Sequence, residues 1–216
     1  MKKLVKILLL LIFNSFLVNS KSFVKPALEF IHITNDDGLS ENWIRCILQD
    51  KLGYLWLGTN VGGLNRYDGN NFEIYQNNKN DSTSISDDDG ISCIYEDKYG
   101  TVWIGADNGL NKYVRKTNSF KRYSFAKIDS NKNNSIGINC ILEDRMGNFW
   151  IGCDKGLIKF DRIKEKFKIY RANQKDSNCL LGDYITTIFE DKSGQLIICT
   201  PGGSFLNDKR ICTAPA

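Results

Sequence analysis

Short runs of apolar residues alternate with polar turns along most of this chain, and after residue 20 no segment sustains the 3.6-residue apolar period of a helix. Residues 91–123 show the pattern clearly. Strand-forming residues at 91–95 precede the turn Asp97-Lys98-Tyr99-Gly100, in which Asp can bond its own downstream backbone and Gly allows a positive φ. Further short runs follow at 102–105, 109–113 and 120–123. The pattern predicts four short strands, with a hairpin between the first two.

The same pattern returns with a period of 47 residues. In four units the turn contains an aspartate and a glycine, namely Asp50, Gly53, Asp97, Gly100, Asp144, Gly147, Asp191 and Gly194. In three units the second run contains a tryptophan and, two residues later, a glycine, namely Trp56, Gly58, Trp103, Gly105, Trp150 and Gly152. Ile197 and Cys199 stand at these positions in the fourth unit. Repeated units of about 40–50 residues with four antiparallel strands are typical of β-propeller blades.

We therefore predict an all-β fold with three complete propeller blades and a partial, degraded fourth blade. The blades are expected at 44–90, 91–137 and 138–184, and the partial blade at 185–216. Residues 21–43 are expected to hold an N-terminal strand, Leu28 to Thr34, and a connection. Residues 1–20 have the pattern of a signal peptide, because three lysines precede an apolar run that is too short to span a bilayer. This pattern predicts an exported protein, periplasmic or extracellular, without a membrane span in this chain.

The repeated residues are interpreted as structural. Because a tryptophan recurs in every complete unit, we expect it to pack between adjacent blades, and the glycine after it indicates a close approach between blades. The turn aspartates are expected to act as turn caps worth about 1 kcal/mol each, by analogy with helix caps. Cys46, Cys93 and Cys140 occupy one equivalent position and are expected to be small buried apolar side chains. A disulfide between Cys153 and Cys199 is left open.

Composition and charge exclude several classes of function. The chain is 42% hydrophobic and 25% charged, which is typical of a folded domain. Of its 29 basic residues three lie in the predicted leader, and the other 26 are nearly balanced by 25 acidic residues, so net charge does not favour binding to nucleic acid or an anionic membrane. His32 is the single histidine, and Asp87-Asp88-Asp89-Gly90 lacks the ligand spacing of an EF-hand. We therefore expect no catalytic residue, cofactor or metal site.

The motifs resemble a known family. The stretch Asn35-Asp36-Asp37-Gly38-Leu39-Ser40, the run at 44–50, and the segments 55–59 and 63–69 are similar to the two-component regulator propeller repeats of bacterial sensor proteins. The resemblance covers roughly residues 28–195 and implies the N-terminal part of the periplasmic sensor domain of a sensor or hybrid histidine kinase, or of a related receptor. It also implies two propellers, a membrane helix and a cytoplasmic output in the full receptor, and a response to carbohydrate breakdown products. The sequence itself contains no kinase motif.

The favoured hypothesis is a non-catalytic, ligand-sensing input fragment of a two-component receptor, whose ligand is an unidentified small molecule or oligosaccharide. Ligand-binding residues should be those that differ between blades, and Arg45 and Arg66 are the candidates on this criterion. The other expected partners are the remaining blades of the receptor or a second copy that pairs through exposed strand edges. Two alternatives stay open: a glycan-active propeller hydrolase or lyase, which requires a non-repeated catalytic cluster, and a truncated or adhesive fragment.

Overall fold

The computed structural model describes residues 30–87, 89–125, 136–173 and 179–206. The chain divides into two compact units, residues 1–32 and 33–216, and every strand named below belongs to the second unit. The predicted signal peptide, residues 1–20, lies outside the described residues.

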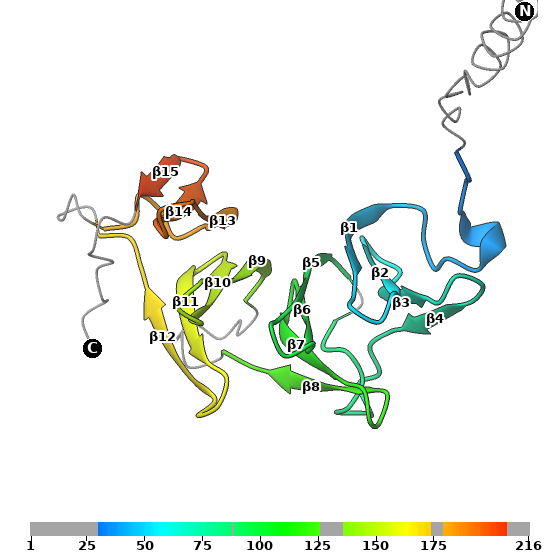
Figure 1. The fold of residues 1–216 in the computed structure, drawn as a ribbon. Helices are drawn as coiled ribbons and strands as arrows, with labels where there is room; N and C mark the ends of the chain where they lie inside the picture. Colours follow the sequence, from blue (N-terminus) through cyan, green and yellow to red (C-terminus); the bar gives the residue numbers. More distant parts are fainter. Residues whose placement is uncertain (1–29, 88, 126–135, 174–178, 207–216) are drawn as a thin grey trace, which may run out of the picture. The chain divides into compact units, whose positions relative to one another are not determined.

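The strands form four antiparallel sheets in which strand order follows the chain (Figure 1). The first sheet comprises β1 (Ile44–Gln49), β2 (Leu55–Thr59), β3 (Leu64–Tyr67) and β4 (Phe72–Tyr75). The second comprises β5 (Ile91–Glu96), β6 (Val102–Ala106), β7 (Gly109–Val114) and β8 (Ser119–Tyr123). The third comprises β9 (Ile138–Glu143), β10 (Phe149–Cys153), β11 (Gly156–Asp161) and β12 (Lys166–Tyr170), and the fourth comprises β13 (Thr187–Glu190), β14 (Leu196–Thr200) and β15 (Gly203–Leu206). The predicted all-β fold of four-stranded propeller blades with a partial fourth blade is confirmed.

The partial fourth sheet contains three strands within the described residues, which is more than the half-blade expected from the loss of the repeat pattern. Strand β15 pairs with β14 in the register Thr200↔Gly203 to Ile197↔Leu206. The turn between them is closed by the Thr200 hydroxyl, which donates a hydrogen bond to the Gly203 carbonyl at 3.0 Å. Backbone pairing makes this strand even though the side chains no longer follow the motif.

The predicted N-terminal strand, Leu28 to Thr34, is wrong in its described part. Residues 30–34 are not in a strand, and a short 3-10 helix, η1 (Asn35–Asp37), follows them. The backbone N–H of Thr34 donates to the Asp37 carboxylate at 2.8 Å, and the N–H of Asp36 donates to the Thr34 hydroxyl at 3.3 Å. These local hydrogen bonds satisfy backbone groups that, in a strand, would have to be satisfied by a neighbouring strand.

Successive sheets pack through their first strands. Strand β1 contacts β5, β5 contacts β9, and β9 contacts β13, while the fourth strands β4, β8 and β12 lie away from this line of contact (Figure 1). The register of the first three sheets places the repeated glycine opposite the repeated cysteine, as in Cys46↔Gly58 and Cys93↔Gly105. The position of the glycine is therefore also the position at which the next sheet approaches.

The repeated glycine is required by this approach. A Cβ on Gly58 would lie 2.5 Å from the Cys46 sulfur and 2.5 Å from Cγ2 of Ile91, which belongs to the next sheet. Equivalent conflicts arise for Gly105 with Cys93 and Ile138, and for Gly152 with Cys140 and Ile185. The prediction of close approach between blades is confirmed, and the approaching group is the isoleucine that begins each new unit.

Gly105→Ala is expected to lower the free energy of unfolding by about 1–3 kcal/mol, because the added methyl overpacks a fully occupied contact. The new Cβ would lie 2.5 Å from the Cys93 sulfur and 2.6 Å from Cγ2 of Ile138. Gly182→Ala is the matched control, since its Cβ would meet nothing closer than Thr200 at 3.9 Å. Urea unfolding followed by circular dichroism compares the two variants, and equal stabilities would contradict the role given to Gly105.

Candidate functional site

The turn aspartates do more than cap a hairpin. In the second sheet, Oδ1 of Asp97 accepts hydrogen bonds from the backbone N–H groups of Tyr99 and Thr101, both at 3.0 Å. Its Oδ2 accepts from Nε1 of Trp103 at 2.9 Å. Asp50 and Asp144 bind Trp56 and Trp150 in the same way, at 2.9 and 2.8 Å. Each complete blade therefore fixes its tryptophan through the turn that precedes it.

An arginine from the next blade completes two of these carboxylate sites. Arg115 donates to Oδ2 of Asp50 at 2.8 Å, and Arg162 donates to Oδ2 of Asp97 at 2.8 Å. Burial alone would raise the pKa of Asp50, but the hydrogen bonds from Trp56 and Arg115 outweigh it and hold that pKa below its usual value. Arg115 and Arg162 each follow their aspartate by 65 residues, and this recurrence is the sequence signal that the assignment as turn caps alone overlooked.

The tryptophans are structural, as predicted. Trp56 is fully buried, and its ring centroid lies 4.8 Å from that of Tyr113 in the second sheet. Trp103 lies 5.1 Å from Phe149 and 6.0 Å from Phe160 in the third sheet. The indole rings therefore fill the space between adjacent blades and are not exposed as a ligand platform.

The two arginines proposed from the sequence lie on different strands. Arg66, on β3, donates to the Tyr113 hydroxyl at 2.5 Å and forms an ion pair with Glu73. Arg45, on β1, lies 3.8 Å from Oδ2 of Asp107. The structure does not bring the two guanidinium groups into one site, and their role in ligand binding stays a prediction.

Other groups considered from the sequence form no reactive centre among the described residues. His32 is exposed. No group of three or more His, Cys, Asp or Glu side chains in the described part of the chain is close enough to hold a metal ion, and Asp88 lies outside that part. Cys153 and Cys199 are not joined by a disulfide, so the bridge left open between them is not formed.

The repeated cysteines are partly buried thiols that pack against the core clusters, so the predicted packing role holds while full burial does not. Cys46, Cys93 and Cys140 are free. Burial raises the pKa of Cys46 to about 11 and that of Cys140 to about 12, and it raises the pKa of Cys93 well above its ordinary value. The thiolate form is therefore scarce at neutral pH, which makes these residues poor nucleophiles.

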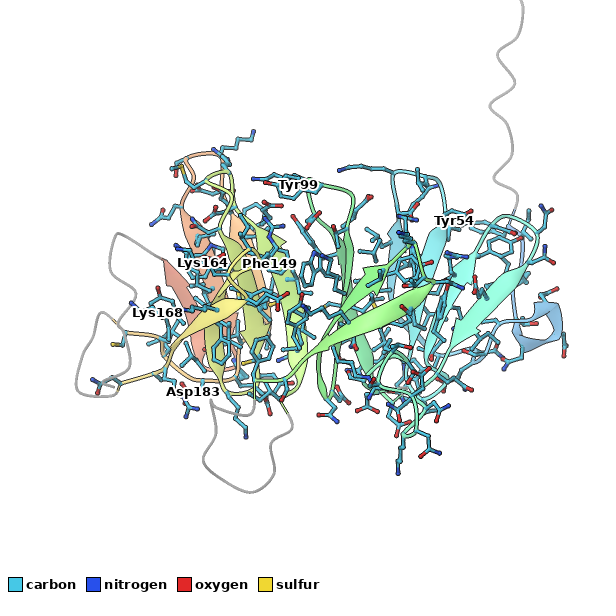
Figure 2. All side chains as sticks on the ribbon, turned by 90° about the horizontal axis from the view of Figure 1, so that it is seen from below. Tyr54, Tyr99, Phe149, Lys164, Lys168 and Asp183 are labelled. Atoms are coloured by element: carbon cyan, nitrogen blue, oxygen red, sulfur yellow. The ribbon has the colours of Figure 1, made fainter. Side chains whose placement is uncertain are left out.

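A cavity of about 610 Å³ lies along the β11–β12 hairpin of the third sheet and reaches the second sheet. In the second sheet it is bordered by the turn at 97–101 and by Trp103 and Lys112. In the third sheet consecutive residues at 159–163 and 166–168 line it. Because neighbouring strand residues point to opposite faces, the cavity follows the edge of the hairpin and not one face alone. Figure 2 places Lys164 and Lys168 on this hairpin and Tyr99 at the turn of the second sheet.

The repeat pattern did not reveal this cavity. Its chemistry is basic, since five lysines and one arginine border it: Lys98, Lys112, Lys159, Lys166, Lys168 and Arg162. The available sequence signal is the density of cations at 159–168, where five of ten residues are lysine or arginine.

Comparison with known proteins identifies the repeat. Residues 38–61, 84–108 and 132–155 match the family model of the two component regulator propeller. The fold thus defines a protein built of propeller blades, and three of its segments match the repeat of the two component regulator propeller.

One curated relative and two solved structures show what the chain is similar to. It is 49% identical over 72 residues to Histidine kinase P4 of Formosa agariphila, a match that covers 33% of this chain and 5% of the relative. The extracellular domain of BT4673 from B. thetaiotaomicron, which is named as a hybrid two component system, is similar at 24% identity with a TM-score of 0.66, over 81% of this chain and 22% of that one. PorZ, a surface component of the type-IX secretion system of Porphyromonas gingivalis, is similar at 17% identity with a TM-score of 0.56, over 76% of this chain and 26% of that one.

The similarity to the two solved structures is one of fold. The chain spans a small part of the length of each relative that it matches. Among the described residues, no helix is long and apolar enough to cross a membrane.

Proposed function

We propose that this chain is a non-catalytic, ligand-sensing input portion of a two-component receptor. The observation that carries the proposal is the match of three segments, residues 38–61, 84–108 and 132–155, to the two component regulator propeller model. The 49% identity with a histidine kinase over 72 residues supports the same assignment.

We propose further that the portion acts outside the cytoplasm and responds to an oligosaccharide. The apolar run after the N-terminal lysines supports export. The likeness to an extracellular domain of a hybrid two component system agrees with this location. The carbohydrate ligand follows from the family resemblance, and its identity is a matter for experiment.

A non-catalytic role agrees with how the buried acids are used. Hydrolysis of a glycosidic bond uses two carboxyl groups that face the substrate. Asp97 is bound by Trp103 and Arg162, and Glu143 is bound by Arg162 and Lys98. These carboxylates are bound to cations at the interface between blades, which supports a non-catalytic role.

The test is an in-frame deletion of residues 44–206 from the chromosomal gene. The transcriptional response of the parent and deletion strains is then measured after exposure to each member of a panel of neutral and acidic oligosaccharides. The proposal expects a response in the parent that is absent in the deletion strain and returns with the intact gene. An unchanged response to every oligosaccharide in the deletion strain would refute it, and so would turnover of a glycan by the purified chain.

A further inference from the structure

We infer that the face of the first sheet that points away from the second sheet is an interaction surface for a propeller blade with tryptophan and glycine on its second strand, and that Ile197 and Cys199 keep this chain's own fourth sheet from occupying it. We call this surface the open face. The inference concerns association between blades, so it goes beyond the proposed function and does not depend on it.

The open face is apolar. In the register of the first sheet Ile47 pairs with Leu57, and Leu55 pairs with Tyr67, so these side chains share one face of the sheet. Trp56 belongs to the opposite face, which packs against the second sheet. The open face therefore comprises Ile44, Ile47, Leu55, Leu57, Tyr67, Phe72 and Ile74.

The same positions are buried in the second sheet, where the first sheet covers them. Ile91, Val102 and Ile104 are 0%, 1% and 0% exposed. On the open face, by contrast, Ile47 is 63% exposed and Ile74 is 45% exposed, and the other apolar side chains are half-buried. A contiguous apolar patch of this kind marks an interaction site.

The segment before β1 covers only part of the open face. The backbone N–H of Ser40 donates to Oδ1 of Asn65 at 3.0 Å, and Nδ2 of Asn65 donates to the Ser40 hydroxyl at 2.7 Å. Ser86 and Asn111 make the same two bonds in the second sheet, at 2.8 and 2.9 Å. There the preceding blade is present as well, so this segment accompanies a blade and does not replace one.

The three interfaces within the chain show what covers such a face. Each preceding sheet presents a tryptophan and, two residues later, a glycine on its second strand. The glycine meets the isoleucine that begins the next unit: Gly58 meets Ile91, Gly105 meets Ile138, and Gly152 meets Ile185. Ile44 holds the same position in the first unit. A blade with tryptophan and glycine at these two places is therefore the occupant that fits the open face.

A polar contact between blades also has its acceptor on the first sheet. The backbone N–H of Lys51 donates to Glu96 of the next sheet at 2.9 Å, and that of Lys98 donates to Glu143 at 3.1 Å. Gln49 stands at the place of Glu96 in the first unit. Its amide oxygen accepts hydrogen bonds as a carboxylate does, so the turn of an incoming blade finds an acceptor.

The fourth sheet lacks the matching residues. Cys199 pairs with Thr187, and Ile197 pairs with Phe189, so Cys199 and Ile197 lie on the face that a further blade would meet. In the first three sheets a Cβ at the glycine position would lie 2.5, 2.6 and 2.7 Å from Cγ2 of the facing isoleucine. The Cys199 side chain would therefore collide with Ile44 of a second copy that docked in the same way.

This mismatch prevents self-association. A chain with matching faces at its first and last sheets would join other copies head to tail, and such contacts produce rings or filaments. The cysteine removes the space for the isoleucine, and Ile197 removes the indole that fills the other interfaces. The open face thus stays available to a blade from outside this chain.

The first test is sedimentation velocity of the full chain and of its double variant Ile197→Trp/Cys199→Gly, which gives the fourth sheet the matching residues. We expect the double variant to self-associate with a dissociation constant roughly 10- to 100-fold below that of the wild type, because an overpacked contact is removed. Adding Ile47→Asp should abolish this association, since it places a charge in the apolar contact. Ile163→Asp is the matched control, because Ile163 is 92% exposed in the β11–β12 turn and belongs to neither face.

A mixing experiment tests the wild-type open face itself. The triple variant Ile47→Asp/Ile197→Trp/Cys199→Gly has a matching fourth sheet and a blocked open face. It should form a one-to-one complex with the wild type and none with the Ile47→Asp chain. Cys199→Gly combined with Ile47→Asp removes only the collision and should bind the wild type more weakly, so the test does not depend on accommodating an added indole. Far-ultraviolet circular dichroism checks the fold of each variant.

The outcomes separate this inference from the proposed function. No complex in either mixture, or a complex that Ile47→Asp of the acceptor chain leaves intact, would overturn the open face as the surface. Self-association of the wild type as tight as that of the double variant would overturn the role of Ile197 and Cys199. None of these measurements involves a ligand or a transcriptional response, so their failure leaves the proposed function standing. An unchanged response in the deletion strain would likewise leave this inference standing.

Discussion

Asp97→Ala will lower the free energy of unfolding by about 3–5 kcal/mol, because it removes one partner of a buried ion pair. A turn cap alone would account for only about 1 kcal/mol. Asp97 is 2% exposed, and its carboxylate binds the Tyr99 and Thr101 backbone, the Trp103 indole and the Arg162 guanidinium. The substitution leaves the Trp103 indole N–H and the backbone N–H groups without their acceptor inside an interface between two blades, and Arg162 keeps only Glu143 as its acidic partner. Urea unfolding followed by circular dichroism measures the loss.

Asp191→Ala is the matched control for this prediction. Asp191 makes the same turn contacts, with the N–H groups of Ser193 and Gln195, but Ile197 stands where the tryptophan would be. Its loss should cost about 1 kcal/mol. In a double-mutant cycle, Asp97→Ala with Arg162→Met should destabilise less than the sum of the single changes, because the two residues interact directly. Equal losses at Asp97 and Asp191 would show that the contacts with Trp103 and Arg162 contribute nothing.

Trp56→Ala will lower the free energy of unfolding by about 3–5 kcal/mol, the range for removing a large buried aromatic side chain. Trp56 has no exposed surface, and its ring contacts Tyr75 within its own sheet and Tyr113 in the second sheet. Removal opens a cavity at the first interface and withdraws a donor from Asp50. Urea unfolding followed by circular dichroism avoids the loss of a fluorescent reporter in this variant.

Two further variants divide the contribution of Trp56. Trp56→Phe keeps a ring in the interface and loses the Nε1 donor to Asp50, so it should cost about 1–2 kcal/mol. Ile197→Ala acts at the equivalent position of the fourth sheet, where the side chain is half-buried, and should cost less than about 2 kcal/mol. A loss at Ile197 as large as that at Trp56 would contradict the view that indole packing between blades dominates.

The repeat made most of the fold predictable. Each complete blade needs the same hairpin turn, the same glycine at the close approach and the same tryptophan. The same residues therefore recur every 47 positions in the sequence. The expected N-terminal strand failed because it was a single copy. Without repetition, an apolar run at 28–34 does not distinguish a strand from an extended segment whose end is capped by Thr34 and Asp37.

The contacts of the turn aspartates could be predicted only in part. Their contacts with the following backbone could be predicted, because they depend on residues two to four positions away. Their contacts with Arg115 and Arg162 could not be predicted from local chemistry, because those residues follow 65 positions later and reach the turn from another sheet. A long-range contact becomes visible in a sequence only when it recurs, and this one recurs twice.

The sequence by itself determined the blade architecture, the packing of the tryptophans between blades and the packing of the repeated cysteines, because these depend on contacts that every complete unit makes. Only the tertiary structure decided how the second and third blades meet, where Thr101 and Phe160 border a cavity and Arg162 reaches Asp97 from the neighbouring sheet. The physical reason is that such a cavity arises where a unit departs from the repeat. The effect of such a departure depends on which side chains lie opposite it in space, and periodicity along the chain does not record that.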